Sequence, residues 1–414
     1  MLTLVSLKTF VMLKKSTLEK VIVSQKKNIE ESDLGLSRSL LEELSKVPNQ
    51  FALIISGIRR CGKSTLLNQF ISRYIEDSFL YLNFDSAKLY TFEIDDFQLL
   101  DEIIEESNFK WVIFDEIQII KAWEVYVRQK IDEGYYVIIT GSNASLLSRE
   151  LGTKLTGRHI TKELFPFSYS EFCAFNSLEK SEEACIDYIE HGGFPGYLKV
   201  RNQDIHTAIL DDIVYRDIAV RHNIRDVKSL KHLLIFLATN TGKLISANKL
   251  KQVVGLKSTA SITEYFNYFE ESYLIQLVPK FSYSHKVQLV NPKKVYFIDS
   301  GLQNAISASY SQDLGRKLEN IVFWELRRQK KTLHYFNENA KECDFVVSDG
   351  NKVNNLIQVC HNLSAENEKR EINGLLEAMK FFDHDKGLIL TMNQEDSITS
   401  NGKRIEVIPV YKYF

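Results

Sequence analysis

Residues 51–68 read FALIISGIRRCGKSTLLN. The apolar run at 51–55 predicts a buried strand, and the apolar residues at 66, 67 and 70 have the spacing of a helix face. Between them lie Gly57, four further residues and Gly62-Lys63-Ser64, the pattern of a phosphate-binding P-loop in its strand–loop–helix context. Its glycines let backbone N–H groups converge on phosphate oxygens, which the helix N-terminus also attracts. The stretch therefore predicts a nucleoside triphosphate site; an incidental glycine-rich turn is the alternative.

The residues predicted to bind the nucleotide form one continuous run: Gly57, Ile58, Arg59, Arg60, Cys61, Gly62, Lys63, Ser64 and Thr65. Lys63 would place a positive charge beside the β- and γ-phosphates, and the Ser64 hydroxyl would ligate the Mg²⁺ that accompanies the nucleotide. ATP is the expected nucleotide, because the chain shows no guanine-reading Asn-Lys-x-Asp element.

A second motif lies at 111–116, where the sequence WVIFDE joins four apolar residues to two acids. This is the Walker B arrangement: a buried strand delivers Asp115 to the magnesium shell, and Glu116 polarises the attacking water. The alternative is an ordinary strand that ends in a charged turn, and the P-loop upstream favours Walker B. Asp115 and Glu116 are therefore predicted catalytic residues, and Ser64 and Asp115 are the predicted metal ligands.

Two further residues are candidates for contact with the γ-phosphate. Residues 136–140 predict another strand, which runs into Gly141-Ser142-Asn143. Asn143 is preferred to Ser142 as a sensor of hydrolysis, and a helix N-cap is the alternative role. Arg158 lies downstream of this strand, where an arginine can stabilise the transferred phosphoryl group of its own or a neighbouring subunit. A salt-bridged surface arginine is the alternative for Arg158.

The order of elements predicts the fold class. Strand patterns at 51–55, 79–84, 111–116 and 136–140 alternate with helical patterns, which predicts an α/β fold with a parallel, doubly wound sheet. In such sheets ligands bind at the carboxyl ends of the strands. A helix is also expected at 36–47, because Leu36, Leu40, Leu41, Leu44 and Val47 recur at helical spacing.

Five motifs occur in an order that resembles a known family: residues 57–67, 114–118, 140–142, 157–158 and 192–195. The family is that of the predicted AAA+-type ATPases of bacteria and archaea, which carry a C-terminal domain of unknown function. The resemblance covers most of the chain. It implies an AAA+ P-loop NTPase fold, a winged-helix segment and a restriction-endonuclease-like tail.

Four domains are expected: a P-loop ATPase domain with its N-terminal helix at 1–170, a helical lid at 171–227, a winged-helix domain at 228–310 and the nuclease-like α/β domain at 311–414. In the third, three helical patterns precede strands at 274–278 and 294–298, which is the winged helix-turn-helix order. Residues 225–294 carry eleven Lys and Arg against four Asp and Glu, as phosphate contacts require. The recognition helix expected at 258–273 has almost no positive charge, so DNA contact and protein–protein packing both stay open.

The tail contains part of a nuclease pattern. A helix at 314–328 carries Glu319, and strands are expected at 332–336, 343–347 and 356–360. Metal-dependent nucleases place a carboxylate on one strand and acid-x-lysine on the next. Asp344 fills the first position, but the next strand reads Gln358-Val359-Cys360, so an amide replaces one ligand and a thiol replaces the lysine. The tail is therefore expected to lack catalysis; an ATP-regulated, Mg²⁺-dependent nuclease is the alternative function.

Composition limits the remaining choices. The chain has 414 residues and net charge −2, so it needs more than one core and shows no overall bias toward nucleic acid. Its five scattered cysteines, the lack of a membrane-spanning apolar run and the lack of a signal-peptide cleavage site lead to an expected cytoplasmic location. Met1 and Met12 are both candidate starts. The expected function is an ATP-hydrolysing switch that engages DNA or a protein partner. A homo-oligomer is one assembly that the sequence allows.

Overall fold

The computed structural model describes residues 13–48, 50–144, 154–155, 157–255, 258–307, 313–350 and 352–414. The chain divides into two compact units. Unit 1 comprises Met1–Gly57 and Gly62–Leu164, and unit 2 comprises Ile58–Cys61 and Phe165–Phe414. The short segment Ile58–Cys61, in the middle of the predicted P-loop, is thus grouped with the second unit.

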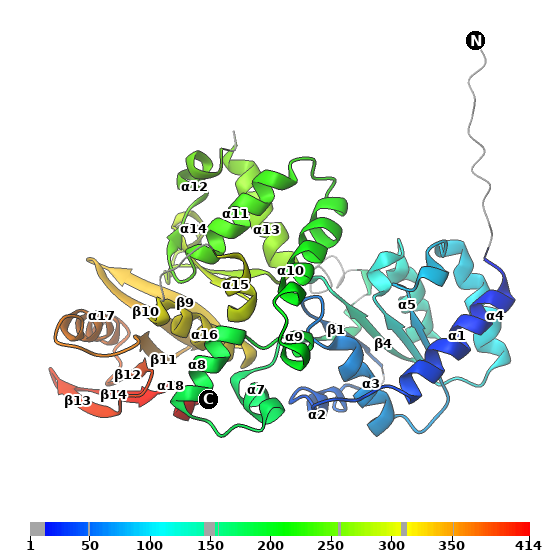
Figure 1. Ribbon diagram of the computed structural model, residues 1–414, viewed down its shortest axis with the longest axis horizontal. Coiled ribbons are helices and arrows are strands. Elements are labelled where there is room, and N and C mark those ends of the chain that lie inside the picture. Colours follow the sequence, from blue (N-terminus) through cyan, green and yellow to red (C-terminus); the bar gives the residue numbers. More distant parts are fainter. Residues whose placement is uncertain are drawn as a thin grey trace, which may run out of the picture. The chain divides into compact units, whose positions relative to one another are not determined.

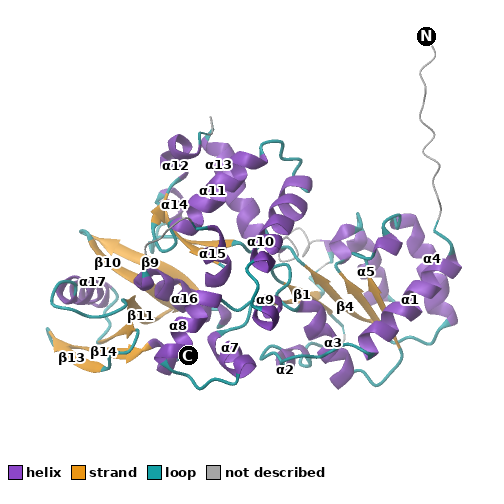
Figure 2. Ribbon diagram, in the orientation of Figure 1, coloured by secondary structure: helices purple, strands orange, loops and turns teal. Residues whose placement is uncertain are grey.

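Unit 1 is built on a parallel five-stranded sheet (Figures 1 and 2), with the strand order β2-β3-β4-β1-β5. The strands are β1 (Ala52–Ser56), β2 (Phe79–Asn83), β3 (Trp111–Asp115), β4 (Tyr136–Gly141) and β5 (His159–Glu163). The helices are α1 (Lys15–Glu30), α2 (Leu41–Leu44), α3 (Lys63–Tyr74), α4 (Phe97–Glu106) and α5 (Trp123–Asp132). Because side chains alternate along a strand, Ile54 packs in a core with α1, α4 and α5, whereas Leu53 lines a small cavity with Phe70 of α3.

The α/β class and the parallel sheet are confirmed, and β1 to β4 lie where the apolar runs predicted strands. The helix expected at 36–47 is confirmed only in part, since only Leu41–Leu44 is helical there. Gln69 of α3 donates hydrogen bonds to the carbonyls of Leu34 and Leu36. The residues before α2 therefore bond to α3 and do not extend α2 toward the N-terminus. The N-terminal helix is instead α1, whose Leu18, Val21, Ile22 and Ile29 are buried.

Unit 2 begins with a helical region. Its helices are α7 (Tyr169–Asn176), α8 (Glu182–His191), α9 (Pro195–Val200), α10 (Asp204–Asp211), a π-helix (Asp212–Val220) and α11 (Val227–Thr239). The turn between α8 and α9 contains Gly192 and Gly193. The Gly193 N–H donates to Asp299 Oδ2 at 2.6 Å, and its carbonyl accepts from Phe167 N–H at 2.7 Å.

A three-stranded antiparallel sheet follows, with the order β6-β8-β7. Its elements are β6 (Leu244–Ile245), α12 (Ala247–Val254), α13 (Thr259–Glu271), β7 (Ile275–Val278), α14 (His285–Val290), β8 (Lys293–Phe297) and α15 (Ser300–Ile306). Three helices therefore come before the β7–β8 pair, as the sequence predicted, and β6 adds a third strand.

The C-terminal part is a mixed six-stranded sheet with the order β13-β14-β12-β11-β10-β9 (Figure 1). Its elements are α16 (Leu314–Arg328), β9 (Thr332–Glu338), β10 (Lys341–Asp349), β11 (Lys352–Val359), α17 (Glu368–Phe381), β12 (Lys386–Thr391), β13 (Asp396–Ser400), β14 (Lys403–Pro409) and α18 (Val410–Tyr413). Buried residues of α17 form a core with β10, β11, β12 and β14. Within the described part of the chain, no helix has the length and apolar character needed to cross a bilayer.

Candidate functional site

The P-loop joins the carboxyl end of β1 to the start of α3. Gly62, directly before α3, has φ 103°, a left-handed conformation that glycine adopts without strain. Lys63 begins the helix with its side chain only 4 % exposed. Its Nζ donates to the Gly57 carbonyl at 3.1 Å and lies 3.5 Å from Glu116 Oε1. The lysine of the loop and the second acid of the predicted Walker B motif are therefore neighbours.

Asp115 lies at the centre of a group of hydroxyl and amide donors. Ser64 Oγ donates to its Oδ2 at 2.8 Å, as do Tyr81 Oη at 2.9 Å and Asn83 Nδ2 at 3.1 Å. Thr140 Oγ1 donates to the other carboxylate oxygen. Complete burial, followed by the charge of Glu116, raises the pKa of Asp115, and the hydroxyl donors oppose that shift. The two predicted metal ligands, Ser64 and Asp115, thus meet directly.

Glu116 follows β3 in a left-handed backbone conformation with φ 56°, which is uncommon for a non-glycine residue. Its N–H donates to Thr140 Oγ1 at 3.2 Å. Its side-chain Oε2 accepts a hydrogen bond from Gln118 Nε2, and that nitrogen also lies 3.4 Å from Ser142 Oγ. The residues that follow β3 and β4 are therefore linked through one side chain.

Asn143 and Arg158 differ in position. Asn143 follows β4, is 3 % exposed, and its carbonyl accepts from Ser56 Oγ at 2.9 Å, beside the P-loop strand. Arg158 precedes β5, and its carbonyl accepts from the N–H of Ala52, the first residue of β1. Since β1 and β5 are parallel, Arg158 lies at the edge of the sheet opposite the loop, one five-residue strand or roughly 16 Å away.

Arg158 therefore lies away from the loop, and a role at the nucleotide site of its own chain stays a prediction that this position does not favour. Its side chain forms a 2.6 Å ion pair with Asp132 at the end of α5. The interpretation in which it reaches a neighbouring subunit stays a prediction.

Of the remaining loop residues, Ile58 and Cys61 are fully buried. Arg59 pairs within unit 2 with Asp217 of the π-helix, through two hydrogen bonds of 2.7 and 2.9 Å. Such a two-pronged pair fixes the arginine side chain in one orientation.

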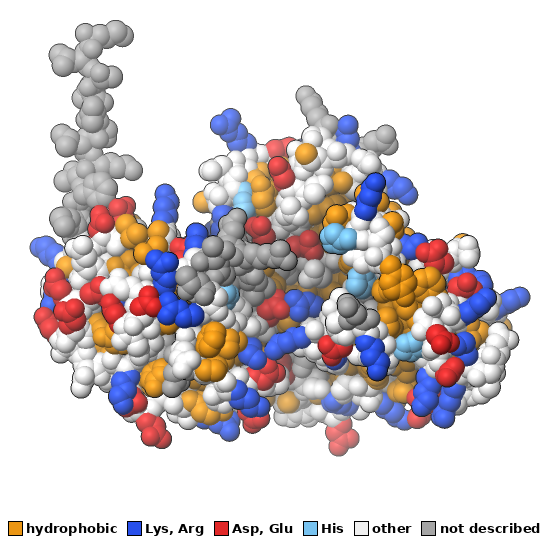
Figure 3. Space-filling model, turned by 180° about the vertical axis from the view of Figure 1, so that it is seen from behind, with side chains coloured by type: hydrophobic (Ala, Val, Ile, Leu, Met, Phe, Trp, Pro, Cys, Tyr) orange, Lys and Arg blue, Asp and Glu red, His pale blue; other side chains and the backbone are white. Residues whose placement is uncertain are grey.

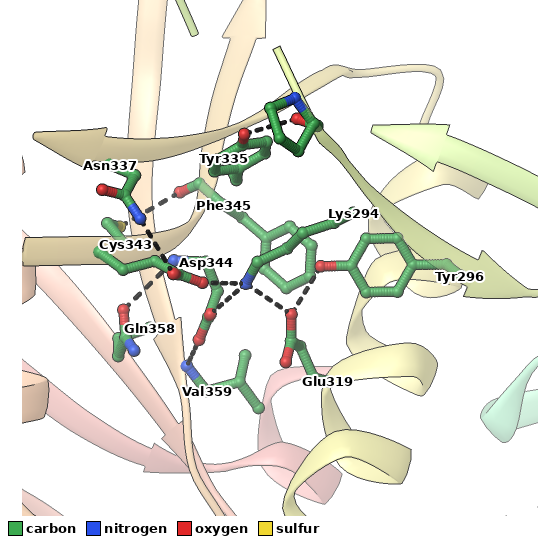
Figure 4. Close-up of polar contacts among 12 residues, drawn as sticks. Lys294, Tyr296, Glu319, Tyr335, Asn337, Cys343, Asp344, Phe345, Gln358 and Val359 are labelled. Atoms are coloured by element: carbon green, nitrogen blue, oxygen red, sulfur yellow. Dashed lines mark hydrogen bonds and ion pairs between the residues drawn. The ribbon is translucent and has the colours of Figure 1, made fainter. Parts of the chain in front are cut away.

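A second concentration of charged groups lies in unit 2, around Lys294 of β8 (Figure 4). Its Nζ contacts Glu342 Oε1 at 2.6 Å, Asp344 Oδ1 at 2.7 Å and Glu319 Oε1 at 3.0 Å, and its side chain is only 2 % exposed. Tyr296 Oη donates to the same Glu319 oxygen at 2.6 Å. We call Lys294, Glu319, Glu342 and Asp344 the lysine cage.

The lysine cage lines a cavity of about 1220 Å³ that also reaches Gln358, Cys360 and Arg370. Burial alone would lower the pKa of Lys294, but the Asp344 and Glu319 carboxylates outweigh it and raise that pKa well above its usual value. Burial and the charge of Asp344 raise the pKa of Glu319 to about 7. Burial also raises the pKa of the Cys360 thiol to about 12, which disfavours its thiolate form at neutral pH. Among the described residues, no group of three or more His, Cys, Asp and Glu is arranged to hold a metal ion.

Comparison with known proteins places the P-loop in a family context. Residues 49–173 match a family model described as an AAA domain, and residues 182–313 match a "Domain of unknown function (DUF8612)". The chain is 36 % identical over 401 residues to the uncharacterized protein MJ1544 of Methanocaldococcus jannaschii, covering 90 % of this chain and 89 % of that protein. It is 31 % identical over 325 residues to an uncharacterized protein of Haemophilus influenzae, covering 73 % and 81 %. The chain belongs to a family of AAA-domain proteins found in archaea and bacteria.

Solved structures resemble this AAA-domain protein more distantly. A signal-transduction ATPase with numerous domains from Pyrococcus horikoshii shares 16 % identity, with 72 % of this chain and 46 % of that chain covered and a TM-score of 0.28. Cdc6p from Pyrobaculum aerophilum shares 13 % identity, with 75 % and 99 % covered and a TM-score of 0.26.

The AAA domain implies nucleotide binding. The donor set also suits Mg²⁺, because Ser64 and Asp115 present a hydroxyl and a carboxylate oxygen in contact, and Mg²⁺ takes few protein oxygens beside phosphates and water. Sequence reasoning missed Tyr81, Asn83 and Gln118 as parts of this site. The first two lie on β2 and reach Asp115, and the rule that ligands gather at the carboxyl ends of parallel strands pointed toward Asn83.

Lys294 was also missed. Its contact with Asp344 joins residues fifty positions apart, on strands of different sheets. The sequence carries no local signal for this contact, because the residue occupies the strand of one predicted domain and the carboxylates belong to another.

Proposed function

We propose that the AAA domain binds ATP with Mg²⁺ and hydrolyses it, and that this turnover acts as a switch on the C-terminal half of the chain. One observation carries the proposal: Ser64 contacts Asp115 at 2.8 Å while Lys63 lies 3.5 Å from Glu116. P-loop NTPases need this meeting of loop lysine, metal ligands and an acid that can accept a proton from water.

The chain's own residues have separate tasks in this reaction. Loop N–H groups and Lys63 bind the phosphates, for which Lys63 leaves Glu116 and the Gly57 carbonyl. Glu116 then accepts a proton from the attacking water. Mg²⁺, which Ser64 and Asp115 would hold, supplies positive charge to the phosphate oxygens. Asn143 follows β4 beside the P-loop strand, where it would sense the γ-phosphate.

Two substitutions test this assignment. Lys63→Ala should weaken ATP affinity strongly, because it removes the charge that neutralises the phosphates. Glu116→Gln should bind ATP normally and lower kcat by about 10²-fold or more, because it removes the proton acceptor. Binding of a fluorescent ATP analogue and phosphate release measure the two effects. Undiminished turnover in both variants would refute the proposal.

The switch is proposed to act through a winged helix at α11 to β8. The helix order and the β6-β8-β7 sheet support this fold, and the net basic charge of residues 225–294 suits a phosphate backbone. On the face drawn in Figure 3, basic and acidic side chains are interspersed, so a DNA contact would be local and a protein partner is the other outcome. ATP turnover with and without duplex DNA, at two salt concentrations, separates the two. A mass measurement in ATP tests homo-oligomer formation, on which the role of Arg158 in a neighbouring subunit depends.

A second candidate function is phosphodiester hydrolysis at the cavity beside the lysine cage. The observation that favours it is Lys294, whose ammonium group contacts both Asp344 and Glu319. Lys294 thus supplies the positive charge that the lysine of the nuclease pattern would provide. In this sequence Cys360 occupies the position of that lysine. Incubation of plasmid DNA with the protein and Mg²⁺ tests it, with Asp344→Ala as the control. Cleavage that disappears in Asp344→Ala supports this function, and intact plasmid argues against it.

A further inference from the structure

The two polar atoms of the Gln118 side chain differ in their hydrogen bonding. It lies in the short turn Ile117–Ile119 that follows Glu116. Its Nε2 donates to Glu116 Oε2 and approaches Ser142 Oγ. Its Oε1 is buried and has no hydrogen-bond partner among the residues that the structure describes. Buried carboxamide oxygens are seldom left without a donor, so this oxygen points to a partner that arrives later.

The surroundings of Gln118 identify that partner. Glu116, to which it donates, is the predicted proton acceptor and lies 3.5 Å from Lys63. Ser142, its other neighbour, follows the strand that ends beside the P-loop, and it is 2 % exposed. The vacant acceptor therefore lies among the groups that would surround a γ-phosphate. The hydrogen-bond donor expected at this place during hydrolysis is the attacking water.

We propose that Gln118 orients the attacking water together with Glu116, a role that rests on the ATP hydrolysis proposed above. The water donates one hydrogen to Glu116 and the other to Gln118 Oε1, which leaves an oxygen lone pair to face the γ-phosphorus. The water oxygen forms a bond to phosphorus as the bond to the bridging β,γ-oxygen breaks. ADP departs with the bonding electron pair, and Glu116 receives the proton.

The amide at Gln118 suits this role because it is both a donor and an acceptor. Its Nε2 holds Glu116 Oε2, so the other carboxylate oxygen becomes available once Lys63 moves to the phosphates. Its Oε1 is fixed by the same planar group, so water and base are held at one relative position. Positioning of this kind speeds the chemical step and leaves the affinity for ATP almost unchanged.

Gln118→Met tests the inference, because methionine has a similar length and neither donates nor accepts strongly. We expect kcat to fall about 10- to 100-fold, with the dissociation constant for ATP and the thermal midpoint of unit 1 in the nucleotide-free protein almost unchanged. Gln129→Met is the matched control. Gln129 lies on α5, and in the described structure its side chain donates only to the exposed Glu133. It should leave kcat unchanged.

Gln118→Glu is the second variant. It keeps an acceptor of the same length but cannot donate to Glu116, so its kcat should fall at least as far. Wild-type protein without ATPase activity would contradict the proposed function itself. Active wild type with a kcat retained within threefold in Gln118→Met, or with ATP affinity lost in parallel with kcat, would overturn the role of Gln118 alone.

Discussion

Gly193 is a residue at which a single methyl group would collide with the backbone. A Cβ built there would lie 2.3 Å from the Phe167 carbonyl oxygen and 2.8 Å from the Phe167 nitrogen. The same residue donates to Asp299, whose pKa burial raises to about 6 while the backbone donors of Gly193 and Leu302 oppose that rise. The glycine pair quoted in the sequence resemblance therefore has a structural explanation: the turn before α9 must lie close to two other segments of unit 2.

Gly193→Ala should lower the free energy of unfolding of unit 2 by about 2 kcal/mol or more, because two backbone segments must separate to admit the methyl group. Gly196→Ala is the matched control, three residues further on. It lies in α9 with open space around its Cβ position, so it should be neutral or stabilising by up to about 1 kcal/mol. Urea unfolding followed by fluorescence measures both. Equal stability of the two variants would show that the close approach of Phe167 carries no cost.

At the level of elements, the strands of unit 1 that sequence reasoning found are buried along nearly their whole length. β1 and β3 are continuous apolar runs, and such runs identify strands of a parallel sheet. β5 was missed because His159-Ile160-Thr161-Lys162-Glu163 is half-buried along its whole length and mostly polar. Helix α16 was found with its bounds, since its sequence repeats at helical spacing up to Arg328.

Whether sequence reasoning could find the two charged sites depended on how close together their residues lie in the sequence. The P-loop and Walker B residues could be found because each motif is local in sequence and the sheet rule brings them together. The lysine cage could not, because β8 supplies the lysine, α16 one acid and β10 the other two. Gln118 could be quoted as part of a motif, but its vacant oxygen is visible only once its neighbours are placed.

Lys294→Met should destabilise unit 2 by about 3–5 kcal/mol at neutral pH, because it leaves three carboxylates without their buried cation. The loss should shrink as the pH falls. Without Lys294 the folded-state pKa of Glu319, already raised to about 7, rises further. An acid with a raised folded pKa contributes stability that is present at low pH and is lost as the pH rises through that pKa.

This prediction can be checked by urea unfolding between pH 5 and pH 8, followed by Trp324 in a background with Trp111→Phe and Trp123→Phe. Lys331→Met is the control, because Lys331 pairs with the exposed Asp349 at 2.9 Å and such surface pairs are worth about 1 kcal/mol or less. A penalty for Lys294→Met that is small, or that grows toward acid pH, would contradict the charge balance described for the lysine cage.

For the whole molecule, the division into two units means that each unit has its own free energy of unfolding. Each unit has its own buried core, and a chain of this kind does not unfold in a single all-or-none step. The tryptophans allow the units to be followed separately, since Trp111 and Trp123 lie in unit 1 and Trp324 lies in unit 2. The predicted domain boundaries at 170, 227 and 310 can then be tested by unfolding shorter segments of the chain.

ATP should raise the thermal midpoint of unit 1 as reported by Trp111 and Trp123 in a Trp324→Phe background. A ligand that binds only the folded state at a concentration of 100 times its dissociation constant adds about 2.7 kcal/mol to the free energy of unfolding. For a unit of this size the midpoint should rise by about 5–10 °C. The shift should disappear in Lys63→Ala, which loses the phosphate contact, and persist in Glu116→Gln, which loses only the proton acceptor. Those two variants therefore separate binding from chemistry in one experiment, and an ATP-induced shift that survives in Lys63→Ala would mean that the nucleotide binds elsewhere in the molecule.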